Sequence, residues 1–167
     1  MNSHHIILVV TLVTALGCGI VAGTLYAFSA FVMRALGRLP SPTGIAAMQS
    51  INVAVINPWF LGVFLGTAMG CGVLIVHDVS HHSAATALLV AGALLYLVGT
   101  VGVTFAFNLP RNEKLAKIDP LSEEGARTWQ EYLKSWTNWN HVRTATSLLA
   151  AIAFTLAFSQ LITSSPL

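Results

Sequence analysis

The chain has 167 residues, of which 55% are hydrophobic and only 8% are charged, and its formal net charge is +2. A soluble domain carries about 25% charged residues, so this composition excludes an ordinary soluble globular protein. The small net charge and the lack of a nucleic-acid-binding motif also give no support to a nucleic-acid partner.

Four apolar runs are long enough to cross a lipid bilayer. About 20 residues at 1.5 Å each span the hydrocarbon core, and each run is rich in Leu, Val, Ala, Phe and Gly without a charge in its middle. We therefore predict an all-α fold, a four-transmembrane-helix bundle that forms a single integral membrane domain over 1–167. The predicted spans are about 6–33, 58–76, 84–107 and 143–162.

The first run differs from a secretory signal peptide. No basic residue precedes it, and it is much longer than the 7 to 15 apolar residues of a signal sequence. We expect it to be a retained helix. Cys18 and Cys71 both fall within predicted spans, where cysteine usually serves as a small apolar filler.

The basic residues predict the orientation in the membrane. All eight Lys and Arg residues lie in the first and third connections or at the edge of the fourth span, whereas the second connection and the C-terminal segment have none. Cytoplasmic connections are enriched in Lys and Arg. We expect an integral protein of the bacterial inner (plasma) membrane, with both termini outside.

The connections also contain helix signals. The segment from Gly44 to Asn52 is expected to form a short helix before the second span. Asp119-Pro120 breaks the chain, and Ser122 is a plausible N-cap with acidic residues in the first turn. A helix that starts there is expected to run into the fourth span as an amphipathic extension.

One face of that extension is aromatic and then polar. At 100° per residue, a stripe about 120° wide contains Trp129, Tyr132, Leu133, Trp136, Trp139, Asn140 and Arg143. For Trp129 and Tyr132, a helix lying on the lipid headgroups explains the pattern equally well. That interpretation does not explain Asn140 and Arg143 on the same face.

Glycines predict how the spans pack. Small residues spaced four apart allow close approach of helix backbones in lipid. Such spacing occurs in the first and second spans, at Gly19, Gly23, Gly62, Gly66 and Gly70.

Polar residues gather at one depth, near the predicted cytoplasmic face. A buried amide without a partner costs about 1 to 3 kcal/mol, and polar residues within a membrane are functional candidates by default. We predict one polar pocket formed by Arg34, Gln49, Asn52, Asn108, Asn140 and Arg143. The alternative is ordinary capping at the helix ends, with Asn57-Pro58 starting a helix and Asn108-Leu109-Pro110 ending one.

Histidines at the outer side form a rival site. Histidine with aspartate suits a first-row metal, but no closed zinc motif is present, and a solvated loop is the preferred interpretation. The residues concerned are His4, His5, His77, Asp78, His81 and His82. Haem also stays open, with His77 or His141 as the axial ligand. No carboxylate lies in a span, which disfavours a carboxylate-bridged di-iron centre.

Four motifs carry a resemblance to a known family. They are "FSAFVMRAL" (28–36), "MQSINVAVINPWF" (48–60), "NLPRNEKL" (108–115) and "WTNWNHVRT" (136–144). In this order they resemble the anthrone oxygenase-like family of small four-helix integral membrane proteins, most bacterial members of which have unknown function. The family pattern usually has proline after the first-span Met, where this chain has Arg34.

The resemblance implies an oxygenase, because the fungal members oxidise anthrones to anthraquinones with molecular oxygen. The acidic C–H of an anthrone needs a base, donors at the enolate oxygen and an apolar slot. We assign His141 as the base and Arg143, Asn140 and Asn108 as the donors. Substrate-binding residues are then Trp136, Trp139, Asn52, Gln49, Arg34 and Phe28.

No cofactor is predicted, although haem or a metal is left open. The expected partners are the lipid bilayer and a small apolar aromatic ligand, and a homo-oligomer also stays open. The alternative function is a non-enzymatic membrane module that binds a quinone, lipid, haem or partner protein in the same pocket, since an arginine beside aromatic rings suits these ligands equally well.

Overall fold

The computed structural model describes the backbone of residues 3–81, 83 and 85–164, with the side chains of these residues except 3 and 79–81. The described residues form helices joined by turns, without a strand among them. Four helical segments in this part of the chain are long and apolar enough to cross a membrane: His4–Leu36, Pro58–Asp78, Thr86–Ala116 and Glu123–Thr163. The predicted all-α, four-transmembrane-helix fold is therefore confirmed.

Each of the first and third helical segments contains π-helical turns, labelled η. In chain order the elements are α1 (Ser3–Ala27), η1 (Phe28–Val32), α2 (Met33–Leu36), α3 (Ser41–Ala54), α4 (Pro58–His81), α5 (Thr86–Leu94), η2 (Leu95–Gly102), η3 (Thr104–Asn108), α6 (Leu109–Ala116) and α7 (Glu123–Thr163).

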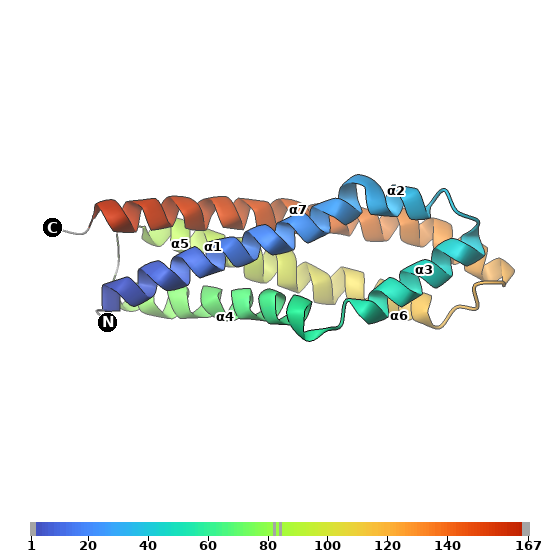
Figure 1. Ribbon diagram of the computed structural model, residues 1–167, viewed down its shortest axis with the longest axis horizontal. Helices are drawn as coiled ribbons and strands as arrows, with labels where there is room; N and C mark the ends of the chain where they lie inside the picture. Colours follow the sequence, from blue (N-terminus) through green and yellow to red (C-terminus); the bar gives the residue numbers. More distant parts are fainter. Residues whose placement is uncertain (1–2, 82, 84, 165–167) are drawn as a thin grey trace.

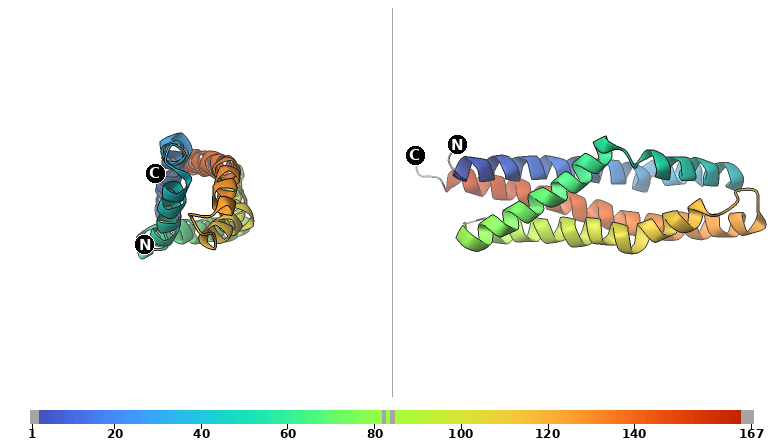
Figure 2. Two further views of the ribbon diagram at one scale, coloured as in Figure 1. Left: turned by 90° about the vertical axis from the view of Figure 1, so that its right-hand side faces the viewer. Right: turned by 90° about the horizontal axis from the view of Figure 1, so that it is seen from below.

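The molecule is elongated, with two chemically different halves. α1 begins and α7 ends at one end, while α2, α3, α6 and the start of α7 form the other (Figure 1). Seen from the second end, α2 and α3 lie on one side and α6 and α7 on the other (Figure 2, left). Seen from below, α4 crosses the bundle obliquely (Figure 2, right). We call the half built from α1, α4, α5, η2 and the rest of α7 the membrane part, and the other half the polar extension.

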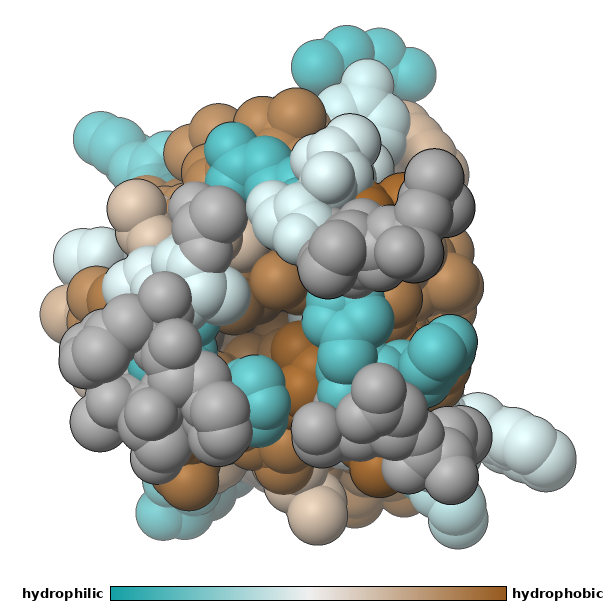
Figure 3. Space-filling model, turned by 90° about the vertical axis from the view of Figure 1, so that its left-hand side faces the viewer, coloured by the Kyte–Doolittle hydropathy of each residue, from teal (hydrophilic) through white to brown (hydrophobic). Residues whose placement is uncertain are grey.

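The distribution of charge distinguishes these halves. Apart from Asp78, the charged residues of the chain are Arg34, Arg38 and those between Arg111 and Arg143. All of these belong to the polar extension or to its border with the membrane part. Viewed from the end with the termini, the flanks of the membrane part are largely apolar (Figure 3). An apolar outer surface is what lipid contact requires, because the bilayer replaces water as the solvent.

α7 joins the two halves without a break. Its 41 residues correspond to roughly 60 Å, about twice the thickness of the hydrocarbon core. The helix starts as the sequence predicts, because the Ser122 Oγ accepts a hydrogen bond from the Gly125 N–H at 2.9 Å, with Glu123 and Glu124 in the first turn. The predicted amphipathic extension is therefore continuous with the fourth span.

Two predicted helix ends behave differently. Asn57 caps α4, since its Oδ1 accepts hydrogen bonds from the N–H groups of Trp59 and Phe60 at 3.0 Å each. The predicted end at Asn108-Leu109-Pro110 is wrong, because the helical segment continues to Ala116. Pro110 lies in the first turn of α6, directly after the π-helical turn η3.

The glycines that allow close packing are mostly not the predicted ones. A Cβ on Gly19, Gly23, Gly62 or Gly66 would meet nothing within 4 Å, and of the predicted set only Gly70 packs closely, against Thr14. At Gly99 a Cβ would lie 2.6 Å from the Cβ of Thr146 on α7. This approach is adjacent to hydrogen bonds from Thr100 to Thr146 (3.1 Å) and to Ser147 (2.8 Å). A spacing of four identifies small faces but not which face meets a neighbour.

We expect Gly99→Ala to destabilise the fold by about 1–3 kcal/mol, the usual cost of overpacking a tight contact. Thr146 cannot relieve the clash by rotating its side chain, because its own Cβ is involved. Gly102→Ala is the matched control on the same π-helical segment, where the nearest atom to a new Cβ is 3.5 Å away. Unfolding in detergent measures both variants, and equal stability of the two would contradict this packing.

The outer histidines, for which a solvated loop was preferred over a metal site, are only partly among the described side chains. His81 and His82 lie outside the residues whose side chains the structure describes. Asp78 is buried, and its Oδ1 accepts hydrogen bonds from the Ser83 N–H at 3.3 Å and hydroxyl at 2.7 Å. Among the described side chains there is no group of three or more His, Cys, Asp or Glu that could hold a metal.

Candidate functional site

α7 presents one buried face from its first turn to its last. Buried residues recur at intervals of three and four, the spacing of one helix face. Where the polar extension meets the membrane part, this face carries Trp129, Tyr132, Trp136, Asn140, Arg143 and Ser147. The polar start of the fourth span therefore points inward, towards the first and third helical segments.

Arg143 is the most unusual member of this face. It is 6% exposed, its Nη2 donates to the Oδ1 of Asn140 at 2.7 Å and its Nη1 to the hydroxyl of Thr104 at 3.2 Å. The guanidinium carbon lies 5.2 Å from the centre of the Trp136 ring. The described residues contain one salt bridge, and it does not involve Arg143. A buried cation without a carboxylate is costly, so it needs another source of stabilisation.

Asn140 connects α7 to the first helical segment. Its Nδ2 donates to the Leu25 carbonyl and to the Ser29 hydroxyl, both at 2.8 Å, and Ser29 also hydrogen-bonds Thr144 at 3.2 Å. Asn140 is fully buried. Because its Oδ1 accepts from Arg143, Asn140 positions the guanidinium against the rest of the bundle.

The third helical segment supplies two more amides. Asn108, which is fully buried, donates to the Trp136 carbonyl at 3.2 Å. The Oδ1 of Asn112 accepts from the Tyr132 hydroxyl and from the Trp136 indole N–H, both at 2.8 Å. Trp129, Tyr132 and Trp136 stack with centroid spacings of 5.7 and 5.9 Å. Aromatic rings of α7 and amide side chains of the third helical segment therefore pack against each other.

Buried polar atoms without partners concentrate here. Nearly all buried polar groups in proteins are hydrogen-bonded, yet Arg143 Nε, Asn52 Nδ2 and Asn108 Oδ1 have no partner. Asn52 lies on α3, beside Tyr132. We call the whole group the polar cluster: Ser29, Asn52, Thr104, Asn108, Asn112, Tyr132, Trp136, Asn140 and Arg143. Its unused groups are two donors and one acceptor, which a small polar ligand could satisfy.

Exposed aromatic residues indicate the depth of the polar cluster. Tyr26 follows the Leu25 carbonyl that Asn140 binds, and Phe105 follows Thr104; they are 62% and 56% exposed. Outward-facing aromatic rings are typical of the membrane–water boundary. The polar cluster therefore lies at the border between the membrane part and the polar extension.

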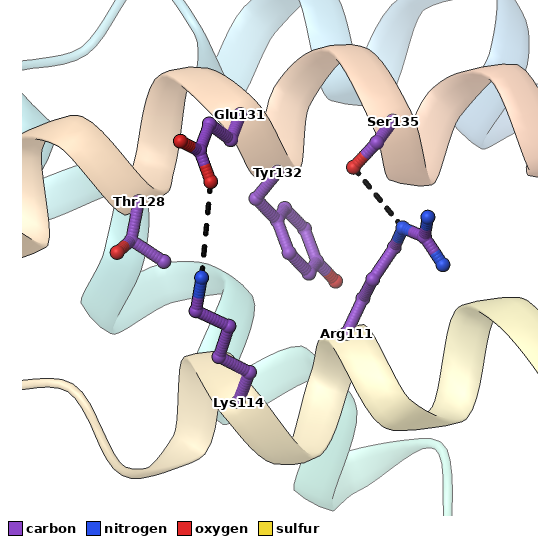
Figure 4. Close-up of a pocket in the computed structure, with 6 residues that line it drawn as sticks. All are labelled: Arg111, Lys114, Thr128, Glu131, Tyr132 and Ser135. Carbon is purple, nitrogen blue, oxygen red and sulfur yellow. Dashed lines mark hydrogen bonds and ion pairs between the residues drawn. The ribbon is translucent and has the colours of Figure 1, made fainter.

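A pocket of about 250 Å³ opens beside the polar cluster, between α6 and α7. The ring of Tyr132 projects into it between the Lys114–Glu131 ion pair, at 3.7 Å, and the hydrogen bond from Arg111 Nε to the Ser135 hydroxyl, at 3.1 Å (Figure 4). Ligand pockets usually begin at about 300 Å³, so this one offers a polar entrance more than a complete binding site.

The structure brings together most of the predicted site residues. Asn108, Asn140, Arg143 and Trp136 contact one another as described, and the ring of Phe28 lies 5.8 Å from that of Trp136. Asn52 reaches the same cluster through Tyr132.

Two predicted substrate-binding residues have other partners. The Nε2 of Gln49 donates hydrogen bonds to the Leu115 and Ile118 carbonyls at 2.9 and 3.0 Å, which fixes the end of α6. Trp139 is half-buried and stacks on Phe107 with a centroid distance of 3.6 Å. Neither side chain has a hydrogen bond to the polar cluster among the described residues, and the stacked Trp139 offers no open slot on the Phe107 side.

Arg34 and His141 do not belong to the polar cluster, which corrects the predicted single pocket. Both are exposed, and both line a separate groove between α2 and α7. His141 follows Asn140 by one residue and is therefore turned by about 100° from it. The placement gives no support to His141 as a base at Arg143, or as a haem ligand inside the bundle.

Four members of the polar cluster were not predicted as site residues: Ser29, Thr104, Asn112 and Tyr132. Tyr132 was placed on the correct face, but headgroup contact explained it equally well. Thr104 has no distinguishing signal, because threonine in an apolar run usually bonds its own helix, as Thr104 also does through the Thr100 carbonyl. Asn112 could have been found by continuing the helix of Asn108 for one more turn.

Comparison with known proteins gives one match. The family model described as anthrone oxygenase matches residues 54–153, which include most of the polar cluster. Neither the curated proteins nor the solved structures give a match.

Proposed function

Because the chain belongs to the anthrone oxygenase family, we propose that it is a membrane-embedded, monooxygenase-like oxidoreductase. Its proposed substrate is an apolar aromatic compound, anthrone- or quinol-like, that reacts with molecular oxygen at the polar cluster. The observation that carries this proposal is Arg143, a buried guanidinium with a free Nε and no carboxylate partner among the described residues. Such a group suits a substrate that becomes negatively charged during the reaction.

The proposed reaction balances without a further reductant. An anthrone loses the proton of its doubly benzylic C–H and forms an aromatic enolate. The enolate passes one electron to O₂, and the carbon radical and superoxide combine to form a C–O bond. After protonation, cleavage of the O–O bond with loss of the remaining hydrogen releases water and forms the second carbonyl. One anthrone and one O₂ thus give one anthraquinone and one water.

The unused groups of the polar cluster have distinct proposed roles. Arg143 Nε and Asn52 Nδ2 donate to the enolate oxygen, and Asn108 Oδ1 accepts from a substrate hydroxyl. These dipoles are fixed before the reaction, so they stabilise the developing charge with little reorganisation. Asn140 is a positioning residue, since its own donors already bind Leu25 and Ser29. Trp136 offers an aromatic face beside the guanidinium.

Proton removal is proposed to use water at the entrance beside Tyr132. No carboxylate or imidazole belongs to the polar cluster within the described part of the chain. Stabilising the enolate lowers the energy needed to remove the proton, and water can carry it through the pocket lined by Arg111 and Lys114. The proposal needs no cofactor, because the enolate itself reduces oxygen.

We expect the purified protein to consume O₂ in detergent when an anthrone is added. One O₂ should disappear for each anthraquinone formed, at a rate above that of heat-denatured protein. An oxygen electrode and the absorbance of the quinone measure the two quantities, and the same sample is analysed for metal and for a Soret band. A Soret band or stoichiometric metal would contradict the cofactor-free reaction. Lack of turnover together with a co-purified quinone would favour the binding module.

A further inference from the structure

A second polar region lies on the outside of the bundle, at the same border. It is a groove of about 400 Å³ between α2 and α7. Arg34, Arg38 and His141 supply its charged or ionisable side chains, and Met33 and Leu133 supply apolar walls. The groove shares Ser29 with the polar cluster, but its charged side chains lie elsewhere, since Arg34 and His141 are exposed, outside the buried face of α7.

The groove is cationic without internal compensation. Arg34 lies on α2 and Arg38 in the turn that follows it; both line the groove, and two like charges at one site repel each other. Among the described residues that line the groove none is acidic, and neither arginine forms a salt bridge within the described part of the chain. An anion placed between the two guanidinium groups would remove this repulsion.

A buried donor faces the same region. Thr137 lines the groove, and its Oγ1 is buried without a hydrogen-bond partner. Arginine and hydroxyl donors together are a common set for phosphate oxygens. The chemistry of the groove therefore fits a phosphate group better than an uncharged apolar ligand.

The position of the groove identifies the source of the phosphate. Tyr26 and Phe31, which precede it on the same helical segment, are 62% and 60% exposed and mark the membrane boundary. Arg34 follows Phe31 by about 5 Å along the helix, and Arg38 lies in the turn directly after α2. Their side chains are thus at the depth of lipid headgroups, with Met33 and Leu133 on the side where the lipid's apolar part would lie.

We propose that the groove between α2 and α7 binds the phosphate group of an anionic phospholipid in the adjacent membrane leaflet. Arg34 and Arg38 contact the phosphate oxygens, Thr137 donates a hydrogen bond to one of them, and Met33 and Leu133 contact the glycerol and the start of an acyl chain. Basic pockets at the edge of membrane helices are suited to such headgroups. The site is independent of the proposed oxygenase reaction.

The test uses delipidated full-length protein in a neutral detergent. Native mass spectrometry measures the binding of phosphatidylglycerol, of phosphatidylcholine and of inorganic phosphate at equal concentrations. We expect retention of phosphatidylglycerol, with much weaker binding of the other two. The double variant Arg34→Gln/Arg38→Gln should bind phosphatidylglycerol about 30-fold more weakly, from about one fivefold factor per arginine.

Two further variants make the result specific. Thr137→Val keeps the shape of the side chain, removes a buried group without a partner and should weaken phosphatidylglycerol binding about 10-fold. Arg127→Gln removes an exposed arginine of α7 outside the groove and should leave binding unchanged. Equal losses in Arg127→Gln and in the double variant would overturn the proposal. Equal binding of both lipids would do so too, and binding of inorganic phosphate at the same affinity would overturn the lipid as its source.

Discussion

Arg143→Lys is expected to insert and fold while its turnover of an anthrone falls by roughly 10- to 1000-fold, the loss seen when one oxyanion donor is removed. Lysine keeps the charge but loses the planar set of donors. Its three N–H groups share one nitrogen, so it cannot donate from the separate positions of Nη1 and Nη2 to Thr104 and Asn140 and also from the position of Nε to a substrate. Because the proposed interaction strengthens as the enolate forms, kcat should fall more than KM rises.

Arg127→Lys is the matched control, since Arg127 is exposed on the same helix. It should leave the rate of oxygen consumption and the thermal stability in detergent unchanged. Unchanged turnover of Arg143→Lys would show that the guanidinium does not act on the substrate. Loss of folded Arg143→Lys would instead assign the arginine a structural role in joining α7 to the third helical segment.

Asn140→Ala is expected to destabilise the protein by about 2–5 kcal/mol. The substitution removes both hydrogen bonds to the first helical segment and the acceptor of Arg143 Nη2. Removing one partner of a buried network leaves the others unsatisfied, and an unpaired buried charge is the most costly of these. The free energy of unfolding in mixed detergent micelles, followed by circular dichroism, measures the change.

Two substitutions distinguish the network from a general effect at this level of α7. Asn138→Ala changes an exposed asparagine two residues away and should cost less than about 0.5 kcal/mol. Asn140→Asp keeps the acceptor for Arg143 but loses the donors to Leu25 and Ser29. We expect its stability to lie between those of the alanine variant and the original chain. Equal stability of Asn140→Ala and Asn138→Ala would exclude Asn140 as a structural link.

The sequence predicts the fold well because lipid imposes a strong and local signal. Apolar runs, the Ser122 cap and the 3.6-residue period of α7 each depend on residues near one another in the chain, and all three are confirmed. The same period placed Tyr132, Asn140 and Arg143 on one face. What a helical period cannot give is the neighbour that this face meets, which is why four of the five predicted packing glycines have open space beside them.

The errors at the candidate site have the same origin. Grouping polar residues by depth brought Arg34 and His141 to the correct level but not to the correct side of their helices. The helical period alone separates His141 from Asn140 by about 100°, so combining depth with phase would have excluded it. Asn112 was left out of the predicted pocket, although it follows Asn108 by one turn of a segment that remains helical to Ala116.

The π-helical turn η1 has a consequence for changes in chain length. A π-helical turn is an α-helix into which one additional residue has been accommodated. Deleting Ala30 from η1 would restore the regular α-helical register and turn α2 by about 100° relative to α1, with a shift of about 1.5 Å. Arg34 and Arg38 would leave the groove, whereas the Leu25 carbonyl that binds Asn140 precedes the deletion and would stay in place. A single deletion at this turn therefore alters the arginines of the outer groove while leaving in place Ser29, which the groove shares with the polar cluster.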